Sequence, residues 1–180
     1  MVEKIIEESI KIENSSIRYA YILDNVLSKT SGNVLEIGAG FGTNTAIFCE
    51  KAIKYNKKVY VIDPFEEGWK DMPESYRYPY EEFVKSTDKY GSTMQLIKKS
   101  SQDIKSIKEY GKLEFAFVDG LQSVGAVLHD LKLVEGASII CVDDYSRRGE
   151  VKDDVDAFVR ATEYKLIETP DENREVYLCK

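Results

Sequence analysis

The feature that most constrains the fold is a regular alternation of short apolar runs with segments of helical periodicity. Seven runs predict strands, at residues 33–37, 58–62, 94–97, 113–118, 137–142, 165–168 and 175–179. Helices are predicted at residues 2–27, 43–55, 80–90, 103–110, 124–134 and 151–162. Such alternation predicts right-handed crossovers and a mainly parallel sheet with helices on both faces. The last two strands are predicted to pair as a hairpin across residues 169–174.

Length and composition indicate one soluble domain. The chain has 180 residues, of which 43% are hydrophobic and 32% charged. Its net charge of −7 argues against nucleic acid as a partner, because phosphate binding needs clustered Lys and Arg. No apolar stretch approaches the roughly 20 residues that cross a bilayer, and the first residues do not resemble a signal peptide. We therefore expect a cytoplasmic protein that does not bind membranes.

The cysteine pattern agrees with a reducing environment. Cys49, Cys141 and Cys179 are widely spaced, and two of them lie in predicted strands. This spacing favours reduced, buried thiols over a zinc site.

In a parallel sheet of this kind, ligands bind beyond the carboxyl ends of the strands, near the point where the strand order reverses. After the first predicted strand, Gly38, Gly40 and Gly42 alternate in Glu-Ile-Gly-Ala-Gly-Phe-Gly (36–42), and Thr43 replaces the third glycine of a dinucleotide fingerprint. This spacing suits a nucleoside with a cationic amino-acid tail. The alternative is an ordinary glycine-rich turn without a ligand.

Polar residues also follow the next two strands. Asp63, 21 residues after Gly42, could accept both hydroxyls of a ribose, or simply cap a turn before Pro64. Ser101 and Gln102 follow the third strand, where a helix cap and an adenine contact are compatible.

Three carboxylates follow the fourth and fifth strands: Asp119, Asp143 and Asp144. Like charges gathered at one sheet edge are costly unless a cation compensates them. Oxygen ligands of this sort suit Mg²⁺. The alternative is that all three acids are solvated and cap the following helices.

These motifs, in this order, resemble those of the class I S-adenosylmethionine-dependent methyltransferases, and more narrowly the small-molecule O-methyltransferases of the catechol and macrolide-sugar type. The resemblance covers residues 33–144. It rests on Val-Leu-Glu-Ile-Gly-Ala-Gly (34–40), Val-Tyr-Val-Ile-Asp-Pro (59–64), Ser-Gln-Asp-Ile (101–104), Phe-Val-Asp-Gly (117–120) and Val-Asp-Asp (142–144).

The resemblance implies a doubly wound, seven-stranded Rossmann-like α/β sheet in a single S-adenosylmethionine-binding domain, residues 1–180, with residues 1–30 as a helical cover. It also implies the cofactor-binding residues, which are Glu36, Gly38, Ala39, Gly40, Asn44, Asp63, Ser101, Gln102 and Asp119. In metal-dependent relatives, the positions of Asp119, Asp143 and Asp144 carry Mg²⁺, which lowers the pKa of a substrate hydroxyl and aligns it with the methyl group.

One position departs from the pattern of the resemblance. Where such enzymes commonly carry His or Lys as a general base, this chain has Gln122, which cannot take a proton at neutral pH. The catalytic positions are thus Asp119, Gln122 and Asp143. The substitute base would be Asp119, a loop tyrosine or, least expected, His129, unless a metal alone activates the hydroxyl.

The acceptor would be a small molecule. Residues 65–80, which include Phe65, Trp69, Tyr76, Tyr78 and Tyr80, could cover it, or these aromatics could anchor the loop. Arg147 and Arg148 could meet an anionic acceptor or be solvated at the surface. The apolar N-terminal helices could form a homodimer or cover the crevice of their own domain.

Three functions follow from these observations. The first is O-methylation of a small-molecule hydroxyl, with or without Mg²⁺. The second, suggested by Gln122, is a degenerate methyltransferase fold that binds the cofactor without turnover. The third, a nicotinamide-dependent dehydrogenase, is disfavoured by Thr43.

Overall fold

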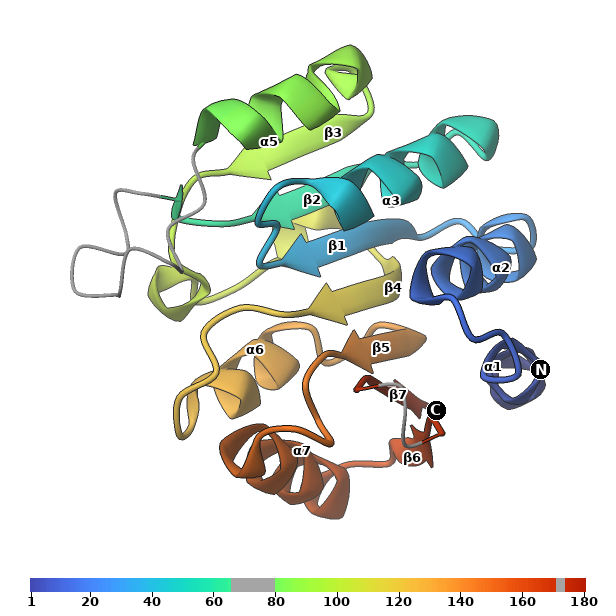
Figure 1. Ribbon diagram of the computed structural model, residues 1–180, viewed down its shortest axis with the longest axis vertical. Coiled ribbons are helices and arrows are strands. Elements are labelled where there is room, and N and C mark those ends of the chain that lie inside the picture. Colours follow the sequence, from blue (N-terminus) through green and yellow to red (C-terminus); the bar gives the residue numbers. More distant parts are fainter. Residues whose placement is uncertain (66–79, 171–173) are drawn as a thin grey trace.

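The computed structural model describes residues 1–65, 80–170 and 174–180 and contains one mixed sheet (Figure 1). Its strands lie in the order β3-β2-β1-β4-β5-β7-β6. β1 to β5 are parallel, while β7 is antiparallel to both β5 and β6. The strands are β1 (Asn33–Ile37), β2 (Val59–Ile62), β3 (Met94–Ile97), β4 (Leu113–Val118), β5 (Ile139–Val142), β6 (Lys165–Glu168) and β7 (Val176–Cys179). The predicted doubly wound α/β fold is confirmed.

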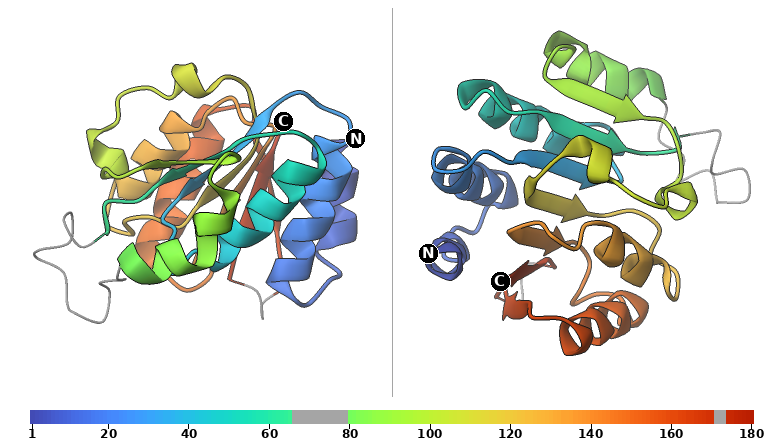
Figure 2. Two further views of the ribbon diagram at one scale, coloured as in Figure 1. Left: turned by 90° about the horizontal axis from the view of Figure 1, so that it is seen from above. Right: turned by 180° about the vertical axis from the view of Figure 1, so that it is seen from behind.

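Helices cover both faces of the sheet, as the view from above shows (Figure 2). One face carries α1 (Val2–Ser9), α2 (Ser15–Leu27), α3 (Thr43–Lys54) and α5 (Tyr80–Thr87). The opposite face carries α6 (Ala126–Leu133) and α7 (Gly149–Ala161). Short 3₁₀ turns lie at Asp88–Tyr90, Ser101–Asp103 and Lys108–Tyr110.

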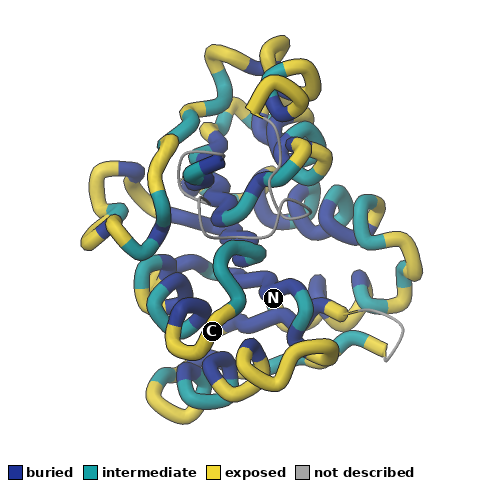
Figure 3. Tube along the Cα trace, turned by 60° about the vertical axis from the view of Figure 1, so that its left-hand side comes forward, coloured by how far each residue is buried: buried dark blue, intermediate teal, exposed yellow. Residues whose placement is uncertain are grey.

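The sheet separates two hydrophobic cores, because successive side chains of a strand point to opposite faces. In β4, Phe115 and Phe117 pack under α2 and α3, whereas Ala116 and Val118 pack under α6 and α7. The ring of Phe48 in α3 makes edge contacts with both phenylalanines, at centroid distances of 5.6 and 5.7 Å. All six residues of β4 are buried, and the central strands form the buried centre of the molecule (Figure 3).

The predicted helical stretch 2–27 is divided into two helices. Asn14 begins the second helix, because its side-chain Oδ1 accepts a hydrogen bond from the backbone N–H of Ile17 at 3.0 Å. Ile5, Ile6 and Ile22 are buried against the sheet of their own chain, and no described residue of the two helices lines the cavity described below. The homodimer stays a prediction.

One predicted helix is wrong. Residues 103–110 form no α-helix: Ile104 is extended at the end of the first 3₁₀ turn, and a second turn begins only at Lys108. The reason is tertiary packing. Ile104 and Tyr110 are both buried in the second core, and the Tyr110 ring stacks on Tyr60 of β2 at 4.5 Å. A continuous helix gives way to a segment that lies along the sheet.

Three cysteines, Cys49, Cys141 and Cys179, are free thiols buried in the first core, as predicted. Burial raises the pKa of the Cys49 thiol to about 12. Within the described part of the chain, every helix is too short or too polar to traverse a bilayer.

Candidate functional site

A cavity of about 600 Å³ opens at the carboxyl ends of β1, β2, β4 and β5. Its position between β1 and β4 is where the strand order reverses, and its volume lies in the usual range for small-molecule sites. Its described lining comprises residues 38–41, Asn44, Asp63, residues 119–123, Asp143, Asp144, Arg148 and Arg174.

The glycine turn after β1 passes very close to the turn after β4. Gly38 has a φ of +85°, and a Cβ at this position would lie 2.0 Å from the carbonyl oxygen of Asp119. Only glycine therefore fits, and its lack of a side chain lets the turn after β1 pack directly against the turn after β4. Asn44, in the first turn of α3, lines the same cavity.

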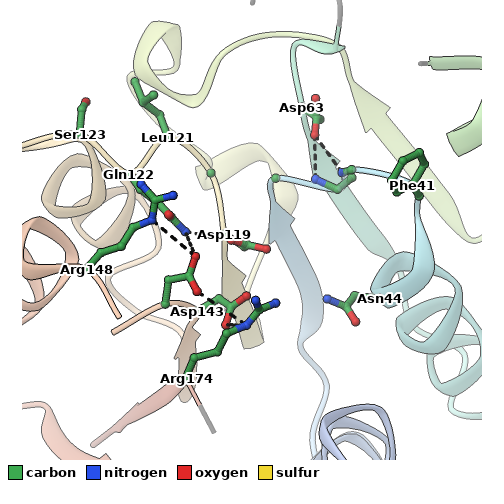
Figure 4. A pocket seen from close by; sticks show the side chains of 15 residues that line it. Phe41, Asn44, Asp63, Asp119, Leu121, Gln122, Ser123, Asp143, Arg148 and Arg174 are labelled. Carbon is green, nitrogen blue, oxygen red and sulfur yellow. Dashed lines mark hydrogen bonds and ion pairs between the residues drawn. The ribbon is translucent and has the colours of Figure 1, made fainter. Parts of the chain in front are cut away.

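Asp63, at the end of β2, holds this turn in place (Figure 4). Its Oδ2 accepts backbone N–H bonds from Ala39 at 2.7 Å and Gly40 at 3.3 Å, and its Oδ1 accepts one from Phe65 at 2.7 Å. Burial raises the pKa of Asp63, although these three hydrogen bonds act to lower it. Each carboxylate oxygen has two lone pairs, so Oδ2 is fully used and Oδ1 keeps the capacity to accept one more hydrogen bond.

Glu36, by contrast, is fully buried within β1 and is not among the described lining residues. The hydroxyl of Thr45 donates to its Oε2, while its Oε1 has no partner among the described residues. The pKa of Glu36 is raised to about 8, chiefly by burial and in smaller part by Asp63 and Asp119, against the opposing effect of the Thr45 hydrogen bond. Glu36 is therefore largely protonated at neutral pH.

Ser101 and Gln102 also lie outside the described lining, and both contact residues of α6. The Gln102 amide nitrogen donates to Oδ1 of Asp130 at 3.0 Å and to the carbonyl oxygen of Ala126 at 3.3 Å. His129, also on α6, donates from Nε2 to the carbonyl oxygen of Ser101 at 3.0 Å. His129 is likewise not among the described residues of the cavity wall.

Asp119, Asp143 and Asp144 converge as predicted. Each offers a carboxylate oxygen, and these atoms lie within 4.8 Å of one another. Burial is the largest cause that raises the pKa of Asp119 well above its ordinary value, and Asp143 and Asp144 raise it further. The pKa of Asp143 is raised as well, by burial, against the opposing effect of Arg174. An all-oxygen donor set of this size fits a hard divalent cation such as Mg²⁺.

Among the described residues, three nitrogen-bearing side chains contact the carboxylates (Figure 4). The Gln122 amide nitrogen bridges Oδ1 of Asp119 at 3.2 Å and Oδ2 of Asp144 at 3.1 Å. Arg174 Nε lies 3.0 Å from Oδ1 of Asp143 and 3.7 Å from Oδ1 of Asp144. Arg148 Nε lies 3.8 Å from Oδ2 of Asp144. Gln122 thus acts as a donor that ties two acids together.

Sequence reasoning missed Arg174. The signal was present, because β7 pairs antiparallel with β5 and Val176 lies opposite Val142. The residues just before β7 must then lie beside those just after β5, which are Asp143 and Asp144.

The predicted aromatic cover lies mostly outside the described residues, since 66–79 are not described. At its described ends, Phe65 is buried and packs on Tyr80 and Phe83, with ring centroids 5.3 and 5.0 Å away. Phe65 thus packs on α5, and the two roles that the sequence left open for the aromatics of 65–80 stay predictions. Arg147 is exposed.

Comparison with solved structures shows the same fold in known methyltransferases. CalS11, described as a TDP-rhamnose 3'-O-methyltransferase of calicheamicin biosynthesis, has a TM-score of 0.68 and 14% identity over 92% of this chain and 78% of its own. The O-methyltransferase NovP has a TM-score of 0.70 and 15% identity over 90% and 79%. S-adenosylhomocysteine-bound PaMTH1 of Podospora anserina has a TM-score of 0.59 and 14% identity over 99% and 86%.

No curated protein sequence gives a significant match. The family model described as a methyltransferase domain matches residues 35–145, which is more than half of the chain. This range contains every lining residue of the cavity named above except Arg148 and Arg174. The resemblance found in the sequence is confirmed, and the chain belongs to the methyltransferase domain family.

Proposed function

We propose that the protein transfers a methyl group from S-adenosylmethionine to a hydroxyl of a small molecule. The observation that carries the proposal is that the glycine turn 38–41, which Asp63 holds in place, and the three-carboxylate cluster line one cavity. A cofactor and an acceptor bound there would be adjacent. The O-methyltransferases CalS11 and NovP, which share the fold, and PaMTH1, which holds S-adenosylhomocysteine, support this assignment.

The wall beside the glycine turn fits the cofactor. The turn 38–40 and Asn44 would hold the methionine part, and Asp63 would accept the ribose hydroxyls. Ser101 and Gln102 would border the adenine, and Asp119 would lie between cofactor and acceptor. Glu36, a buried and neutral acid, would lie beneath the turn that holds the methionine part of the cofactor. The absence of side chains at Gly38 and Gly40 lets a ligand approach the backbone.

Asp119, Asp143 and Asp144 would hold Mg²⁺, which their donor set fits. When bound, the ion would supply Lewis acidity towards the acceptor hydroxyl.

The chain's own residues would position the acceptor and move its proton. Gln122 orients Asp119 and Asp144 by donating to both. Because Gln122 cannot accept a proton, we assign the proton-accepting role to Asp119, whose carboxylate lines the cavity beside Gln122. Asp143 would help to align the hydroxyl. Methyl transfer then depends mainly on proximity and alignment.

Calorimetric titration with S-adenosylhomocysteine tests the cofactor site. Asp63→Ala should abolish binding, and Asp63→Asn, which perturbs the turn less, should weaken it at least about 100-fold, or about 2.7 kcal/mol. Asp88→Ala is the matched control, since Asp88 is exposed and is not among the described residues of the cavity wall. A melting curve establishes that each variant is folded. Unchanged affinity in a folded Asp63 variant would contradict the site.

A second candidate function, cofactor binding without turnover, is favoured by Gln122 alone. Assaying methyl transfer to phenolic, sugar and amine acceptors separates the two, with Mg²⁺ and with a chelator. Transfer to a hydroxyl supports the enzyme. Cofactor binding without transfer to any acceptor supports the second function.

Asp143→Asn should remove Mg²⁺ dependence, and activity that is indifferent to the chelator would exclude the metal.

A further inference from the structure

The guanidinium of Arg174 forms ion pairs with the carboxylate cluster. Among the described residues, Arg174 makes the closest ion pair with the cluster, from Nε to Oδ1 of Asp143 at 3.0 Å, and it reaches Asp144 at 3.7 Å. Arg148 reaches only Asp144, at 3.8 Å. A guanidinium on Asp143 and Asp144 uses carboxylate oxygens that a divalent cation would also need.

The backbone beneath Arg174 is held firmly in place. The next residue, Glu175, is buried and forms an ion pair with Arg18 of α2, whose side chain is fully buried. Arg18 also donates from Nε to the carbonyl oxygen of Ile12 at 3.0 Å and from a terminal nitrogen to that of Glu13 at 3.0 Å. On the other side, the backbone N–H of Ser146 donates to the carbonyl oxygen of Arg174 at 3.4 Å.

The side chain of Arg174 is not confined in this way. It is 46% exposed, whereas that of Asp143 is 7% exposed. A fixed backbone with a half-exposed side chain lets the guanidinium leave the acids for solvent without moving the strand. The anchor through Glu175 and Arg18 keeps it within reach to return.

We propose that Arg174 is a resident counter-cation that competes with a divalent metal ion for Asp143 and Asp144. In the metal-free protein Arg174 neutralises the cluster, and metal binding requires its guanidinium to swing out. The inference rests on the metal site of the proposed function. It makes Arg174 a positioning residue that sets how tightly the cluster holds metal.

Metal titration of the full chain tests this without any assay of activity. Mg²⁺ is titrated by calorimetry, and Mn²⁺ by its spin-resonance signal, into the wild type, Arg174→Gln and Arg147→Gln. Arg174→Gln should bind both ions about tenfold more tightly, since one competing ion pair is gone. Arg147→Gln should match the wild type, because Arg147 is exposed and lies outside the described cavity wall.

A second variant covers a failure of Arg174→Gln to fold. Arg174→Lys keeps the charge but loses the planar fork, and it should raise metal affinity by a smaller factor than Gln. Equal or weaker binding in a folded Arg174 variant overturns the proposal, as does the absence of metal binding in all proteins. These titrations contain no cofactor, so a failure of S-adenosylhomocysteine binding would be seen separately and would count against the proposed function instead.

Discussion

At the scale of single residues, the site depends on Gly38, a position where only glycine is compatible with the neighbouring backbone. Gly38 combines a positive φ with contact against the carbonyl group of Asp119. Gly125 has a similar φ of +79°, yet a Cβ there would meet nothing within 4 Å. Substitutions at Gly38 and Gly125 therefore separate the free-energy cost of a positive φ from the cost of the steric contact with Asp119.

We expect Gly125→Ala to lower the free energy of unfolding by about 1–2 kcal/mol, the cost of a left-handed alanine. Gly38→Ala should lower it by about 3 kcal/mol or more, because two turns must also separate. Urea unfolding of both variants measures the difference. Equal losses would show that the two turns are not in the contact described.

Glu36 predicts a pH dependence of stability. Its pKa is raised from 4.5 to about 8, so the folded protein keeps a proton that the unfolded chain has released. Its contribution to stability is complete below the unfolded pKa and is lost as the pH rises towards about 8. The slope from this one proton is at most about 1.4 kcal/mol per pH unit.

Glu36→Gln should therefore flatten the fall in unfolding free energy between pH 5 and pH 8, because an amide has no proton to release. Urea unfolding at several pH values, with the exposed Glu81→Gln as the control, tests it. A slope identical to that of the wild type would mean that Glu36 is ionised throughout.

At the scale of elements, α2 is attached to the start of β7 through the buried pair of Arg18 and Glu175. The pair is costly to bury, and breaking it leaves one charge without compensation. The surface pair of Lys85 and Glu82, by contrast, is largely solvated.

Arg18→Ala should lower the free energy of unfolding by about 3–5 kcal/mol, whereas Lys85→Ala should cost no more than about 0.5 kcal/mol. Thermal and urea unfolding check both values. A loss below about 1 kcal/mol for Arg18→Ala would indicate that Glu175 finds another partner or takes up a proton.

Elements were predictable from the sequence where the local pattern and the packing agree. The apolar runs at β1 and β4 match the strands closely because both faces of these strands are buried. The segment 103–110 was not predictable, since Ile104 and Tyr110 follow the sheet instead of a helical period. The break at Asn14 shows the same limit, because a cap signal competes with a continuous apolar pattern.

At the scale of the whole molecule, parallel topology explains why the site could be predicted at all. Carboxyl ends of parallel strands share one edge, so Asp63, Asp119 and Asp143 had to come near one another. Side-chain partners depend on segments distant in sequence. That is why neither Arg174 on Asp143 nor the turning of Gln102 towards α6 could be read from local motifs.

The sheet also predicts a gradient of local stability. β4 is central and buried throughout, whereas β3 and β6 are edge strands with half-exposed residues. Amide hydrogens of β4 should exchange roughly 100-fold or more slowly than those of β3. Hydrogen exchange read by mass spectrometry measures this, and equal protection in β3 and β4 would contradict it.

Because all three cysteines are buried, we expect the native protein to react only slowly with thiol reagents. Cys49, Cys141 and Cys179 belong to α3, β5 and β7, three elements far apart in the chain. The rate at which a thiol-specific dye labels each cysteine therefore measures how fast the element that carries it opens to solvent. Identifying which cysteine is labelled first would show where the molecule begins to come apart.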